Sequence, residues 1–171
     1  MAIALTAVLN VAFTYPEWRN YRPAAPVEVA AGGTGIIGTV EAAVVDVWAR
    51  STYPTGEPAP EGTVVLQATV RLEATGSDQP YCEPRFRIDD AVWQEYNDGV
   101  GAVPGQDVYG MSNTGCTWPW EADPAEPHEA TWLFVVPEDA VAEARTAAVE
   151  IIDPTAFPAY LRLAVDPGSL H

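Results

Sequence analysis

The chain has 171 residues, a formal net charge of −16 from 24 acidic and 8 basic side chains, and a hydrophobic content of 48%. This length and apolar content suit one compact domain and exclude a chain that is disordered throughout. Every basic side chain is arginine. A surface this acidic repels phosphate backbones, so we exclude nucleic acid as a partner.

Residues 1–26 have the composition of an apolar membrane anchor that ends at the membrane interface. Met1–Phe13 is almost wholly apolar, and it is followed by aromatic and arginine side chains at Tyr15, Trp18, Arg19, Tyr21 and Arg22. Such side chains are typical of the boundary between hydrocarbon and water. We therefore expect a single-pass helix in the cell membrane, with the rest of the chain on the extracytoplasmic side. A cleaved signal segment and a helix buried in a soluble domain are the alternatives.

Cys82 and Cys116 are the only cysteines. An even pair in an exported chain predicts one disulfide. By the chain-entropy model, closing a loop of about 33 residues stabilises the fold by about 3 to 4 kcal/mol. The two histidines lie at scattered spacings and do not complete a zinc site with these cysteines. Two separate buried thiols are the remaining alternative.

Residues 27–38 are expected to form a flexible linker because they are rich in glycine and follow a Pro-Ala stretch. The Gly32–Gly38 run is superficially similar to a dinucleotide-binding loop. Such a loop needs a strand before it and a helix after it, whereas this run precedes a predicted strand. We therefore expect no cofactor at this position.

Residues 39–171 show the period-two alternation of apolar and polar side chains that predicts β-strands. The clearest strand is Thr63–Thr75, where every second residue from Val64 to Ala74 contributes to one apolar face. Further strands are expected in the run that ends at Pro137, in 159–165, in Arg85–Asp89 with Phe86 and Ile88 inward, in Ala147–Ile152, and in Val40–Arg50 with Val45 and Val47 on one face.

One internal segment predicts a helix of about two turns. Pro137 is tolerated at the start of a helix, Glu138 and Asp139 suit the positive end of the helix dipole, and Arg145 suits the other end. A single short helix among many strands, without strand-helix-strand alternation, predicts an all-β, antiparallel β-sandwich. We expect this sandwich to be one domain over 39–171.

Several motifs resemble a bacterial family of exported, immunoglobulin-like domains found on lipoproteins and membrane-anchored proteins. They are Phe86-Arg-Ile-Asp-Asp, Val92-Trp-Gln-Glu-Tyr96 and Trp132-Leu-Phe-Val-Val-Pro137-Glu-Asp, and the resemblance spans roughly 35–166. It implies an immunoglobulin-like β-sandwich, an Asp in a turn before an aromatic residue, and a Val-Pro corner at the end of the later strand. The lipoprotein cysteine is absent from the N-terminus, which leaves an apolar helix as the tether. The family has no defined catalytic residues to carry over.

The sequence favours neither a metal site nor a catalytic set. Acidic residues are plentiful, yet they lack the spacing of a calcium-binding loop. His128 lies in an acidic, loop-like run without a nucleophile motif, which indicates a surface histidine. The pairs Asp89-Asp90 and Glu138-Asp139 are adjacent in sequence, so they point to opposite faces of a strand or cap a helix. We expect no metal, no cofactor and no enzymatic activity.

Aromatic side chains after the second cysteine provide the strongest candidate binding surface. The proline between Trp118 and Trp120 restricts the backbone, and two exposed rings can bind a sugar face or a partner protein. The alternative is that these rings pack over the disulfide or cover one end of the sandwich. The candidate binding surface comprises Trp118, Trp120, Trp93, Tyr96 and Tyr109.

Together these observations predict a non-catalytic, membrane-tethered domain that binds a protein or another ligand at the cell envelope. One alternative is an accessory subunit that stabilises a larger membrane protein complex, with its N-terminal helix docked on other membrane helices. A weaker alternative is an exported hydrolase that uses carboxylates.

Overall fold

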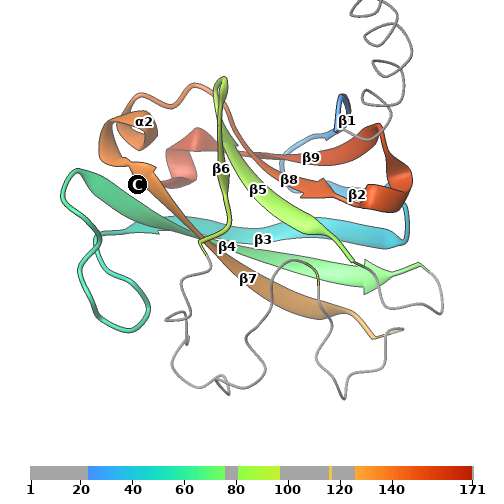
Figure 1. The fold of residues 1–171 in the computed structure, drawn as a ribbon, viewed down its shortest axis with the longest axis horizontal. Helices are drawn as coiled ribbons and strands as arrows, with labels where there is room; N and C mark the ends of the chain where they lie inside the picture. The colour runs from blue at the N-terminus through green and yellow to red at the C-terminus, as the bar shows by residue number, and fades with distance from the viewer. Residues whose placement is uncertain (1–22, 76–80, 97–115, 117–125, 171) are drawn as a thin grey trace, which may run out of the picture.

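The computed structural model describes residues 23–75, 81–96, 116 and 126–170. These residues form a β-sandwich of two sheets with little helix (Figure 1). Both sheets are mainly antiparallel, and the single parallel pair among the described strands joins β1 to β9. The predicted β-sandwich is therefore confirmed, although its first strand runs parallel to its neighbour.

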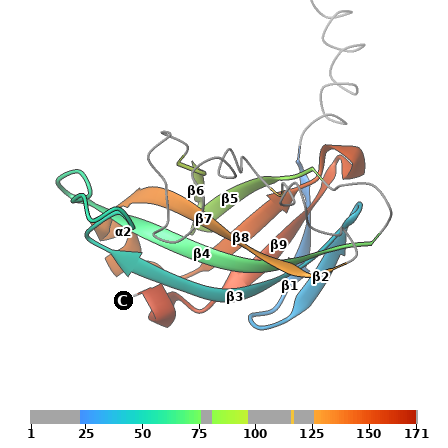
Figure 2. The ribbon, with the colours of Figure 1, turned by 90° about the horizontal axis from the view of Figure 1, so that it is seen from below.

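The five-stranded sheet has the order β1-β9-β8-β5-β6, and the four-stranded sheet has the order β2-β3-β4-β7. Seen from below, the strands of one sheet cross those of the other (Figure 2). The bounds of the first sheet are β1 Ala25–Val29, β9 Ala159–Val165, β8 Ala147–Ile152, β5 Glu83–Ile88 and β6 Ala91–Gln94. Those of the second are β2 Thr34–Ile37, β3 Val40–Arg50, β4 Thr63–Ala74 and β7 His128–Pro137.

The core lies between the sheets and follows from the alternation in the sequence. In β4, Leu66, Val70 and Leu72 are fully buried, while Arg71 on the other face is exposed. The rings of Phe86 from β5 and Phe134 from β7 meet across the two sheets with their centroids 5.5 Å apart. Burial of such large apolar side chains is the main favourable contribution to folding. The strands predicted here are confirmed.

Strand β3 departs from the predicted alternation at its centre. Val47 is buried, with 3% of its surface exposed, whereas Val45 is 52% exposed. The pairing of β3 with β4 shifts register between Val44 and Asp46, as in a β-bulge. A bulge adds one residue to one strand and reverses the faces beyond it. The prediction that Val45 and Val47 share a face was therefore wrong.

Two strands lie where the sequence predicts a flexible linker. Strand β1 pairs with β9, and β2 pairs with β3. Between them, Gly32 adopts a positive φ of 75° in a tight turn. A Cβ at Gly35 would lie 2.5 Å from a methyl group of Leu161 on the other sheet. Glycine is thus required at position 35 for close packing of β2 against β9 rather than for flexibility.

The short helix α2, Glu138–Ala142, begins where it was predicted but has only five residues. Glu138 and Asp139 occupy its first turn, as expected, and its last turn has no basic residue. Arg145 instead lies beside the β5–β6 turn, where its Nε is 3.8 Å from Asp89 Oδ2. The carboxylate of Asp89 also accepts hydrogen bonds from the backbone and hydroxyl of Thr146. Arg145 therefore helps to fix a turn and does not act as a helix cap.

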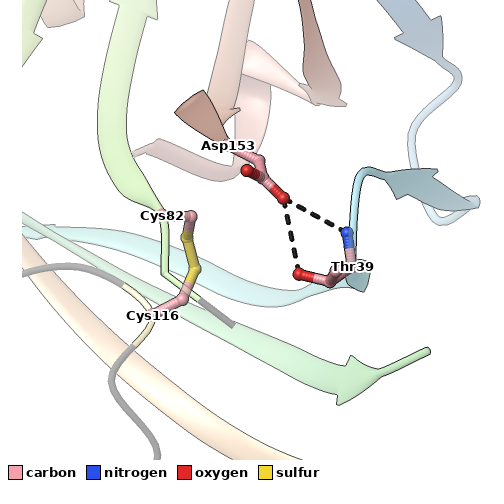
Figure 3. The surroundings of a disulfide bond; sticks show 4 residues. All are labelled: Thr39, Cys82, Cys116 and Asp153. Atoms are coloured by element: carbon pink, nitrogen blue, oxygen red, sulfur yellow. Dashed lines mark hydrogen bonds between the residues drawn. A yellow bond between two sulfur atoms is a disulfide. The ribbon is translucent and has the colours of Figure 1, made fainter. Parts of the chain in front are cut away.

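A buried carboxylate joins the two sheets at one corner. Asp153, directly after β8, accepts hydrogen bonds from the backbone N (3.2 Å) and Oγ1 (3.4 Å) of Thr39, in the turn between β2 and β3 (Figure 3). Its other oxygen accepts from the backbone N (2.7 Å) and Oγ1 (2.6 Å) of Thr155. Because buried carboxylates need such partners, this residue fixes the β2–β3 turn to the end of β8.

Cys82 and Cys116 form a disulfide, as predicted (Figure 3). Both residues are fully buried, and their Cα atoms are 4.9 Å apart. The backbone N of Cys116 also donates a hydrogen bond of 3.1 Å to the carbonyl oxygen of Cys82. The bridge ties the residue before β5 to the stretch of chain that precedes β7.

Replacing Gly38 by alanine is expected to destabilise the protein strongly. Gly38 has a φ of 54°, and a Cβ there would lie 2.0 Å from Asp153 Oδ2. The matched control is Gly62→Ala, because Gly62 has a φ of 75° with open space around its Cβ position. We expect Gly62→Ala to cost only the about 1–2 kcal/mol of the left-handed backbone, and Gly38→Ala to cost clearly more, in urea unfolding. Equal losses would show that the Asp153 contact contributes nothing.

Reduction of the disulfide is expected to lower the Tm by about 5 to 15 °C, since a bridge of this loop length contributes about 3 to 4 kcal/mol. Scanning calorimetry with and without reductant measures the shift. The double variant Cys82→Ala/Cys116→Ala is the control and should melt at the same temperature in both buffers. Labelling of both thiols in the native, oxidised protein would contradict the bridge.

Candidate functional site

A row of alternating charges crosses the outer face of the five-stranded sheet. In the register of the sheet, Glu28 on β1 lies beside Arg162 on β9, Arg162 beside Glu150 on β8, and Glu150 beside Arg85 on β5. Val149, the neighbour of Glu150, belongs to the core. Because successive side chains of a strand point to opposite faces, the charged row lies on the face away from the core.

Glu150 is the centre of this row. It is only 2% exposed, and β8 is buried along its whole length. Its Oε1 accepts hydrogen bonds from Arg87 Nε at 2.5 Å and from Arg162 Nε at 3.0 Å. A carboxylate removed from water is costly unless it is paired in this way. The two guanidinium groups therefore make the buried position of Glu150 tolerable.

Arg162 connects Glu150 to the edge of the sheet. Its Nη1 donates to Glu28 Oε1 at 2.8 Å, and its Nη2 donates to the hydroxyl of Tyr160. Burial acts to lower the pKa of Arg162, but Tyr160, Glu150 and Glu28 outweigh it and leave the pKa raised. Burial, with the charge of Glu150, also raises the pKa of Tyr160. Arg162 thus remains charged and Tyr160 neutral at physiological pH.

The arginines of this face keep part of their surface in solvent. The side chains of Arg85, Arg87 and Arg162 are 27%, 25% and 23% exposed. Within the described ranges, the ion pair of Arg85 is a long one, 3.6 Å, with the exposed Glu83. The arrangement offers rigidly held guanidinium N–H groups, which recognise carboxylates and other acceptors well. This outer face can therefore bind polar or acidic groups through hydrogen bonds.

The outer face of the four-stranded sheet has a hollow of about 120 Å³. Two carboxylates, Glu41 on β3 and Glu73 on β4, lie directly opposite each other beside it. Like charges in such a cross-strand pair repel, and the same lining also contains the basic side chain of Arg71. The hollow is lined by Thr34, Glu41, Ala42, Ala43, Arg71 and Glu73.

Two members of the predicted aromatic surface, Trp93 and Tyr96, lie among the described residues. Trp93, on β6, is half-buried and packs against the core. Tyr96 follows β6, and its backbone N–H donates a hydrogen bond to the carbonyl oxygen of Leu133 on β7, with N and O 2.7 Å apart. The ring centroids of Tyr96 and Tyr53 are 5.3 Å apart. Outside the described residues lie Tyr109, Trp118 and Trp120 and the predicted interface residues Tyr15, Trp18, Arg19, Tyr21 and Arg22.

The histidine and the acidic pair that were considered as catalytic candidates lie in a strand and in a turn. His128 begins strand β7 rather than a loop, and burial lowers its pKa, so its expected place on the surface was wrong. Asp89 and Asp90 form the turn between β5 and β6, with Asp89 at a φ of 48°. In the described part of the chain, three or more potential metal-binding side chains never gather. The same residues contain no helix that is long and apolar enough to cross a membrane.

The residues of the charged row were not predicted from the sequence. Glu150 stands in the middle of Ala-Ala-Val-Glu-Ile-Ile, which was predicted only as a strand. A charged residue within such an apolar run signals a buried ion pair, because it needs a partner on a neighbouring strand. The alternation of Arg85 and Arg87 around Phe86 was a second signal, since it places both guanidinium groups on one face.

Known proteins show little similarity in sequence to this chain. No protein-family model matches it, and neither does any curated protein. An uncharacterized β-sandwich protein from Clostridium difficile 630 aligns with 81% of this chain and 93% of its own, at 13% identity and a TM-score of 0.49.

Two more solved bacterial structures align over similar lengths. A conserved hypothetical protein from Bacillus anthracis matches 80% of this chain and 94% of its own, at 11% identity and a TM-score of 0.49. A candidate lipoprotein from Staphylococcus aureus NCTC 8325 matches 83% and 93%, at 7% identity and a TM-score of 0.49. The assignment of the fold therefore rests on the strand order and the two sheets described above.

Replacing Glu150 by alanine is expected to destabilise the protein by about 3 kcal/mol. This is at the lower end of the cost of breaking a buried ion pair, because water can partly rehydrate the two arginines. Urea unfolding at pH 7 measures the loss. The control is Glu83→Ala, which removes an exposed carboxylate at a long distance from Arg85 and should cost less than about 1 kcal/mol. Similar values for the two variants would show that the network around Glu150 is not coupled to folding.

Proposed function

We propose that the protein is a non-catalytic, immunoglobulin-like domain that binds a protein partner at the cell envelope, and that its binding surface is the outer face of the five-stranded sheet. The observation that carries this proposal is the charged row, whose buried Glu150 accepts hydrogen bonds from Arg162 in the row and from Arg87 beside it, both of which remain partly exposed.

The support for binding is preorganisation. The hydrogen bonds from Glu150 to Arg87 and Arg162 fix both guanidinium planes before a partner arrives. A partner then loses less free energy in ordering these long side chains. Arginine is also the charged side chain that best serves protein interfaces, since its planar group binds acceptors in pairs and is weakly hydrated.

The same contacts support a role without catalysis. Oε1 of Glu150 already accepts two charged hydrogen bonds, so this carboxylate is committed to Arg87 and Arg162. A general acid or base must be free to exchange a proton with the reacting group. The outer face is therefore better suited to holding a partner than to transforming a substrate.

The support for an exported, tethered domain comes from the disulfide and from the N-terminal composition. Disulfides persist in oxidising compartments outside the cytosol, and Cys82 and Cys116 are bridged. The tether would be residues 1–22, which lie outside the described part of the chain. Their apolar run and the aromatic and arginine residues after it suit a membrane segment with its interface.

The strand order supports the immunoglobulin-like assignment. The last two strands, β8 and β9, lie beside β5 in the order β9-β8-β5, and β6 extends the same sheet as one extra strand does in variable-type domains. The position of the bridge differs from that of antibody domains, where a disulfide joins the two sheets. Here it ties the start of β5 to Cys116, between β6 and β7.

Photo-crosslinking in the cells that produce the protein tests the binding face. A benzophenone side chain replaces Gln94, which is exposed beside Arg85 at the end of the charged row. The matched control replaces Arg71, which is exposed on the outer face of the other sheet. We expect protein adducts from position 94 and few or none from position 71, because only the first face makes the contact.

Adducts from position 71 alone, or none from position 94, would overturn the assignment of the face. External protease on spheroplasts tests the compartment in the same cells. The domain should be digested or released while cytosolic proteins stay intact.

A further inference from the structure

The order of charges in the row makes it complementary to itself. Read across the sheet, it is acid, base, acid and base at Glu28, Arg162, Glu150 and Arg85. Reversal of this order exchanges every acid for a base. We infer that the outer face of the five-stranded sheet binds a second copy of this chain, an inference that rests on the proposed function of the same face.

The symmetry of this contact is fixed by the register. A two-fold axis parallel to the strands, between β8 and β9, exchanges β9 with β8 and β1 with β5. Arg162 then faces Glu150 of the second copy, and Glu28 faces Arg85 of the second copy. Such an interface is isologous, because the same patch serves on both subunits and the contact closes at two copies.

The neighbouring row fits the same axis. Ala164 on β9 and Ala148 on β8 are paired in the sheet. The rotation therefore places Ala164 of one copy over Ala148 of the other. Ala148 is buried and Ala164 is partly buried, so neither side chain projects beyond its neighbours. Arg162 lies beside the axis, and Arg87, which pairs with Ala148, lies one strand farther from it.

The outer pairs of the row supply the new interactions. Glu28 is 59% exposed, and its described charged contact is with Arg162 Nη1. Arg85 is 27% exposed, and its one ion pair among the described residues is the 3.6 Å contact with Glu83. Glu150 is saturated by two arginines and hidden from solvent, so it positions Arg162 and does not itself reach a partner. The dimer therefore depends mainly on two symmetric pairs between Glu28 and Arg85.

The charge of the molecule favours a second copy over other acidic surfaces. The whole chain carries −16, so two copies repel over most of their surface. The row contains two acids and two bases and is locally neutral. Two copies can therefore approach through this face with matched charges, whereas a different partner would have to supply the same alternation independently.

Charge reversal tests the two symmetric pairs in the full chain, kept in mild detergent. Arg85→Glu or Glu28→Arg alone places like charges together twice, so each should weaken the dimer by about tenfold or more. The double variant Glu28→Arg/Arg85→Glu restores both pairs and should dimerise again. A mixture of the two single variants should form a heterodimer, since each then supplies the charge that the other lacks.

Sedimentation velocity and co-purification of two differently tagged copies measure these states. The matched control is Arg71→Glu, which changes the net charge as Arg85→Glu does but lies on the other sheet; it should dimerise like the wild type. Thermal melts check that each variant folds, and where a reversal lowers the Tm substantially, Arg85→Ala and Glu28→Ala replace it and should weaken the dimer.

Three results would overturn the inference. The first is a wild-type chain that stays monomeric at about tens of micromolar, a concentration at which even weak association is detectable. The second is single charge reversals that do not weaken the dimer, and the third is a double variant that does not dimerise again. If position 94 then still gives adducts with a different protein, the binding face stands and only the second copy is wrong. If position 94 gives none, the proposed function fails with it.

Discussion

A carboxylate shielded from water must find its partners within the protein, and two such groups organise this fold. Glu150 lies within the central strand β8, and Asp153 directly follows that strand. Glu150 fixes the arginines of the outer face, and Asp153 fixes the turn that connects β2 to β3. The apolar core supplies most of the driving force for folding, but these two residues determine where the outer face and the corner are held.

Regular alternation explains what the sequence could predict. Strands such as β4 and β7 have one buried and one solvated face, so their period of two is visible without a structure. The bulge in β3 was not visible, because one extra residue leaves composition unchanged while it turns Val45 outward. Strands β1 and β2 were missed because they are short and surround glycines that read as flexible.

The candidate site was harder to predict than the fold because its partners are distant in sequence. Glu150 is 12 residues from Arg162 and 63 from Arg87, and only the sheet order brings the three together. An alternating pattern tells which residues share a face but not whether that face is covered, so the half-buried packing of Trp93 against the core could not be predicted from the sequence.

The parallel pairing of β1 with β9 has a mechanical consequence. All five residues of β1 are in register with β9, which is the last strand of the sheet. A force that pulls the two ends of the chain apart therefore acts along both strands in opposite directions. The hydrogen bonds between them share the load in shear and must yield together, whereas bonds at the end of a hairpin would open one after another. The pairing of β1 with β9 therefore resists stretching between the start of the first strand and the end of the last.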